Sequence, residues 1–207
     1  HMINENIISF NSPVASIQNK LVANTLEGLD PDIISDLYLA SRWQEFGSFV
    51  LLEIKNSEQT ILDDLTDEAW NDYSKNKDPI LMKNAQELET AKKASIEIAS
   101  KALQNYNSIK ENTKVIKDYA KKIGISSAIL EDLSQDIEEK QELFVNSKSE
   151  DGWDIKDAYS TGKNAFRQSD DIENRLKVLN PADETPTCGN PCEIAVTLLS
   201  KESLAME

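Results

Sequence analysis

Histidine is almost missing from this chain of 207 residues, because the one histidine is His1. The pair His1-Met2 resembles the remnant that a cleaved purification tag leaves behind. A chain with no other histidine excludes Ser-His-Asp and Cys-His catalysis, histidine metal sites and histidine pH switches. Glycine and proline are also scarce, with 6 of each, which argues against a turn-rich β fold.

Long hydrophobic runs are missing too. No stretch approaches the about 18 consecutive apolar residues of a membrane-spanning helix, so we expect no membrane span. No charged start followed by an apolar core marks a cleavable signal peptide. Residues 3–12 are instead rich in Asn, Ser and Ile, which resembles the uncleaved export signals of bacterial type III secretion substrates. An ordinary frayed terminus is the alternative, so secretion without a signal peptide and a cytoplasmic location both stay open.

The formal charge of −15 is unevenly distributed along the chain. Residues 1–75 hold 4 basic and 13 acidic residues. Residues 76–125 hold 10 basic and 6 acidic residues. Residues 126–207 hold 8 basic and 18 acidic residues. A mildly basic rod thus lies between two acidic flanks. The flanks either fold back on the rod or bind the rod of a neighbouring copy. Nucleic-acid and membrane-surface binding are disfavoured, because both need clustered Lys and Arg.

The strongest pattern is a heptad repeat that begins after Asp78-Pro79, a pair typical of a helix start. Counting every seventh residue from Leu81 to Ile123 gives seven positions. Six of them are apolar, and Ser95 is the exception. We therefore predict a long central helix over 79–123, roughly 65–70 Å in length. Asparagines at other seam positions weaken a two-stranded dimer, so this helix is expected to be a spine packed by helices of its own chain.

A second helix is predicted to follow directly over 127–146, because Gly124 ends the first and a serine caps the next. The short connection predicts an antiparallel hairpin of 79–123 with 127–146. The fold class is therefore all-α, an elongated helical bundle.

The whole chain is predicted to divide into three parts. Residues 1–11 are predicted to be a disordered or frayed N-terminus, 12–180 a single helical domain, and 181–207 a loop with a cysteine pair and a short C-terminal segment. Within the domain, the apolar run Phe49-Val50-Leu51-Leu52 is expected to be the central buried element. Gly47 is expected to kink or break the segment that carries it.

Cys188 and Cys192 form the one unusual motif, with Gly and Pro between them. A structural disulfide is the first interpretation, and two inert thiols or a redox or metal role are the others. A closed metal site needs four ligands, which the chain lacks. Acid pairs such as Asp63-Asp64 are expected to lie on solvated helix faces. We expect no cofactor, no metal site and no small-molecule ligand.

Three aromatic residues are candidates for an interface: Trp153, Tyr106 and Tyr119. Trp153 stands in a polar break between helices, and the two tyrosines widen the apolar stripe of the long helix. Aromatic residues of this kind are frequent anchors of protein interfaces. Trp43 is expected to be a core residue instead.

These features predict a non-enzymatic helical protein for protein–protein interaction or self-assembly, with a start that fits export from bacteria. The layout resembles the secreted filament and needle-tip proteins of type III secretion, in arrangement only. One alternative is an acidic inhibitor or chaperone-like protein that masks a basic partner surface. The other is an enzyme that uses the carboxylate pairs or the Cys188/Cys192 pair.

Overall fold

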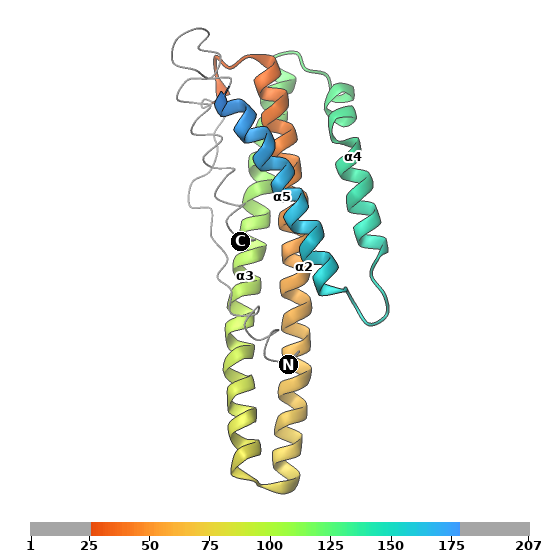
Figure 1. The fold of residues 1–207 in the computed structure, drawn as a ribbon. Coiled ribbons are helices and arrows are strands. Elements are labelled where there is room, and N and C mark those ends of the chain that lie inside the picture. Colours follow the sequence, from red (N-terminus) through yellow and green to blue (C-terminus); the bar gives the residue numbers. More distant parts are fainter. Residues whose placement is uncertain (1–25, 179–207) are drawn as a thin grey trace.

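The computed structural model describes residues 26–178, which form four α-helices and no strand within that range (Figure 1). The all-α class and the elongated bundle are thus confirmed. Two long helices lie side by side along the molecule, α5 crosses over α2, and α4 stands at the side. The helices are α2 Pro31–Asn76, α3 Pro79–Lys122, α4 Ser127–Asn146 and α5 Ile155–Val178.

Helix α2 is continuous for 46 residues, so the break predicted at Gly47 is wrong. The Asp30 carboxylate accepts a hydrogen bond from the backbone N–H of Asp32 at 2.9 Å, and Pro31 occupies the first turn. One glycine inside a helix costs only about 1 kcal/mol, less than the burial of the apolar run that follows it. Gly47 serves close packing instead, because the ring of Phe166 from α5 lies directly against it.

Helix α3 has nearly the predicted bounds, but it pairs with a different helix. Its heptad positions are buried at Leu88, Ala102, Ile109 and Ile116. It packs along α2, and only Lys77 and Asp78 separate the two helices. The expected hairpin of 79–123 with 127–146 is therefore not the pairing in the structure. The physical reason is that α2 offers a longer apolar face than α4 does.

Helix α4 begins where the sequence predicts and is attached lightly. The Ser126 hydroxyl accepts from the backbone N–H of Ile129 at 3.3 Å. Among the described residues, α4 lies mainly against α2. It buries four side chains, those of Leu130, Ser134, Ile137 and Phe144.

Two separate apolar cores hold the two halves of the bundle, and a third cluster joins α2, α3 and α5 through Leu51, Leu52, Ala102 and Phe166. The larger of the two cores joins residues of all four helices in the half of the molecule that α4 and α5 occupy. The smaller one consists of Leu62, Ala69, Ala85, Leu88 and Ala91. Of the described helices, only α2 and α3 reach this far half, as Figure 1 shows.

Polar side chains also join α5 to α2 inside the core. Lys55 and Glu58 are 3% and 2% exposed, and their Nζ and Oε2 atoms lie 3.4 Å apart. Lys55 also donates to the hydroxyl of Tyr159 at 3.0 Å. Further along, the Gln44 amide donates to the Glu173 carboxylate at 3.0 Å. Buried polar groups need such partners, so these bonds specify how α5 lies on α2.

Replacing Gly47 by alanine would place a Cβ atom 2.8 Å from Cε2 of the buried Phe166 ring. Alanine favours a helix over glycine by about 1 kcal/mol, whereas overpacking a core costs about 1–3 kcal/mol. We expect Gly47→Ala to lower the free energy of unfolding by about 1 kcal/mol, measured by urea denaturation.

The matched control removes the ring. In a Phe166→Ala background, Gly47→Ala should instead raise the free energy of unfolding by about 0.5–1 kcal/mol, because only the helix preference remains. A stabilising Gly47→Ala in the parent protein would contradict the close packing of Phe166 on α2.

Candidate functional site

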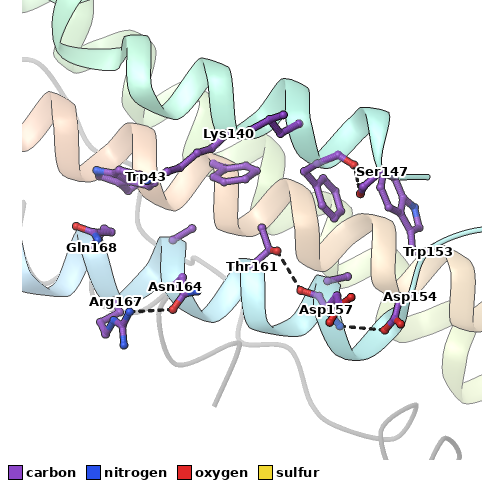
Figure 2. A pocket seen from close by; sticks show the side chains of 15 residues that line it. Trp43, Lys140, Ser147, Trp153, Asp154, Asp157, Thr161, Asn164, Arg167 and Gln168 are labelled. Carbon is purple, nitrogen blue, oxygen red and sulfur yellow. Dashed lines mark hydrogen bonds between the residues drawn. The ribbon is translucent and has the colours of Figure 1, made fainter. Parts of the chain in front are cut away.

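A groove runs between α4 and α5, with α2 as its floor (Figure 2). We call it the aromatic groove, and its volume is about 550 Å³. Four aromatic rings line it: Trp43, Phe46, Phe144 and Trp153. The other lining residues come from α4, the turn after it and α5, and are Lys140, Leu143, Ser147, Asp154, Asp157, Ala158, Thr161, Asn164, Ala165, Arg167 and Gln168.

A stacked aromatic pair forms one end of the groove. The rings of Phe144 and Trp153 are nearly parallel, at 4°, with centroids 4.1 Å apart. The tight turn between α4 and α5 produces this contact, because Ser149 and Gly152 exchange two backbone hydrogen bonds of 3.0 Å. Gly152 has a φ of +98°, which glycine adopts without strain. The turn therefore folds Trp153 back onto the end of α4.

One apolar side chain of the groove lining is largely exposed to solvent, among exposed polar and charged residues. Leu143 lines the groove and is 69% exposed. Its neighbour Val145 is also exposed. Trp43 is buried, as predicted for a core residue, and Lys140 Nζ lies 5.1 Å from its ring centroid. Exposed leucine beside aromatic rings is typical of surfaces that bind another molecule.

The charged residues of the groove are separated by sign. Figure 2 shows Lys140 and Arg167 near Trp43 at one end, and Asp154 and Asp157 at the other. The Asp154 carboxylate accepts from the backbone N–H of Asp157 at 3.1 Å and so caps α5. The groove is thus basic at one end and acidic at the other.

Of the three predicted interface residues, the structure places only Trp153 in this groove. Tyr106 is half-buried on α3, with its ring centroid 5.9 Å from that of Phe49. Tyr119 packs against the larger core near the end of α3. The candidates therefore do not form one surface.

Sequence reasoning missed Leu143 and the groove role of Phe144. Phe144 has the spacing of a core residue, which it also is. A signal for this surface was available, because Leu143 and Val145 lie outside the apolar face defined by Leu130 and Ile137. Apolar residues on the solvated side of a helix indicate an interaction surface.

The acid pairs and the cysteine pair were the other features singled out in the sequence. No group of three or more potential metal ligands occurs in residues 26–178. Asp63 forms an ion pair with Lys92 at 3.5 Å. None of the described helices is long and apolar enough to cross a membrane. Cys188, Cys192 and the Asn/Ser/Ile-rich start at residues 3–12 lie outside the described residues.

Burial raises the pKa of the Tyr106 phenol, and the Glu45 carboxylate adds to that effect. A raised pKa in the folded state favours the neutral phenol. Tyr106 therefore stabilises the fold below its ordinary pKa of about 10, and this contribution is lost as the pH rises above it.

We expect tyrosinate absorbance to include a component from Tyr106 that titrates above the ordinary pKa, and Tyr106→Phe to remove that component. Glu45→Gln should shift the same component to lower pH. An unchanged titration in Glu45→Gln would contradict the role of this carboxylate.

Comparisons with known proteins give no relative for this chain. No family model, no curated protein and no solved structure matches it. Function is therefore inferred from the groove and its surroundings.

Proposed function

We propose that this protein is a non-enzymatic helical interaction protein, and that the aromatic groove binds a helix of a partner protein. The observation that carries the proposal is the exposure of Leu143 beside the stacked rings of Phe144 and Trp153. Amphipathic helices commonly bind in apolar grooves between other helices. Aromatic anchors surrounded by polar residues are also the usual centre of such interfaces.

The shape of the groove supports a helix as the bound element. Helices α4 and α5 form its two walls, and α2 closes the floor. A third helix in this position would complete the layer over α2 and bury Leu143, which lines the groove. Burying a leucine side chain contributes about 1.5–3 kcal/mol, enough to matter for affinity.

Self-assembly is the second candidate, and a different observation favours it. In the far half of the molecule, the described helices α2 and α3 leave Ile80, Met82 and Ile96 exposed. An uncovered pair of helices with apolar outer positions can pack on a second pair to form a four-helix bundle. This surface is separate from the aromatic groove.

The groove proposal is tested with a synthetic amphipathic helical peptide that carries leucines along one face. We expect saturable binding by calorimetry, and Leu143→Ser should weaken it about tenfold. Ile129→Ser is the matched control, because Ile129 is 51% exposed on the same helix and does not line the groove. The control should bind within about twofold of the parent protein.

Both variants should unfold at the parent temperature, because both side chains are largely exposed. No saturable binding, or equal weakening by the two variants, would overturn the groove proposal. Light scattering over a range of concentrations then tests the second candidate. A mass that rises with concentration and is unchanged in Leu143→Ser would support self-assembly through the far half.

A further inference from the structure

We infer that the aromatic groove binds its partner helix in one direction, with the helix N-terminus at Asp154 and Asp157 and the C-terminus at Lys140 and Arg167. This inference rests on the proposed function and adds the polarity and charge pattern of the partner. The expected partner is an amphipathic helix with basic residues in its first turn and acidic residues in its last turn.

The separation of the charges along the groove carries the inference. Asp157 and Arg167 are ten residues apart on α5, which corresponds to about 15 Å along a helix. On the opposite wall, Lys140 precedes Ser147 by seven residues, or about two turns. A bound helix of about three turns therefore places its two ends beside charges of opposite sign.

The dipole of a bound helix responds to these charges. Each helix carries about half a positive charge at its N-terminus and half a negative charge at its C-terminus. Carboxylates favour the first and cations favour the second, and each favourable charge changes an affinity by about two- to fivefold. Four charges arranged by sign thus make one direction of binding more favourable than the reverse.

The charged groups are positioned to act on a bound helix. Asp154, Asp157 and Arg167 are exposed to solvent. Arg167 donates to the Asn164 side chain at 2.9 Å, which directs its guanidinium along the groove wall. Lys140 forms an exposed ion pair with Asp136 one turn earlier, which offsets part of its charge, so Arg167 contributes most to the basic end.

Lys148 is a cation close to the acidic end of the groove. Lys148 Nζ lies 5.7 Å from the Trp153 ring centroid, yet Lys148 does not line the groove. The charges on the lining of this end are therefore those of Asp154 and Asp157. The polarity of the groove does not depend on Lys148.

The inferred direction also fits the neighbouring helices. A helix that starts at Asp157 and ends near Arg167 runs parallel to α5. Because α4 ends beside the acidic end of the groove, the bound helix runs antiparallel to α4. It also runs antiparallel to α2, whose Trp43 marks the basic end. Antiparallel neighbours are the common arrangement in helical bundles.

The test uses two synthetic peptides with blocked termini and the same leucine face, each held helical by a hydrocarbon staple so that the end charges do not change the helicity of the free peptide. The N-basic peptide has lysines in its first turn and glutamates in its last, and the C-basic peptide has them exchanged. We expect the full-length protein to bind the N-basic peptide about tenfold more tightly. A nitroxide at the N-terminus of that peptide should broaden the amide signals of residues 154–158 rather than those near Arg167.

The variant Lys140→Glu/Arg167→Glu should reduce the tenfold preference to about twofold or less, because the basic end is then acidic. Lys163→Glu is the matched control, since Lys163 is exposed on α5 outside the groove, and it should keep the preference. Equal binding of both peptides, or preference for the C-basic peptide, would overturn the inferred direction while the interaction function stands. Binding of neither peptide would overturn the proposed function itself.

Discussion

The structure depends on the packing of one long helix, α2, with each of the other described helices. Its apolar positions contact α3 along the whole hairpin and α5 over the half that carries the larger core. Its buried polar residues, Gln44 and Lys55, pair with side chains of the same bundle and join α5 to it. Among the described helices, the most extensive contacts are those that α2 makes with α3 and α5, so the arrangement of the bundle depends mainly on α2.

The unequal strength of these contacts explains where the groove lies. Helix α5 packs so closely on α2 that Gly47 is needed beneath the Phe166 ring. Helix α4 buries only four side chains and is joined to α5 by the turn that stacks Trp153 on Phe144. The space between a tightly packed helix and a lightly packed one is the aromatic groove. The exposure of Leu143 in the groove is a consequence of this arrangement.

Local sequence signals predicted well where helices begin. The sequence predicted poorly which helices pack against each other. Asp78-Pro79 and Ser126 marked helix starts because capping depends on neighbouring residues alone. The partner of α3 depends on which of two apolar faces is longer, which a short connection does not reveal. Gly47 was misread for a similar reason, since the ring that packs on it lies far away in the sequence. The groove is formed by residues of three helices, and those of α2 lie far from the others in the sequence. Of the three interface residues predicted from the sequence, only Trp153 lines it.

Amide hydrogen exchange on the full chain tests the central claim that α2 is the shared core helix and α4 a lightly held wall. We expect the amides of α2 between Ile33 and Ile54 to be the most protected. Amides of α4 should exchange at least about tenfold faster, because local opening of α4 exposes few buried side chains. Protection of α4 equal to that of α2 would contradict the account.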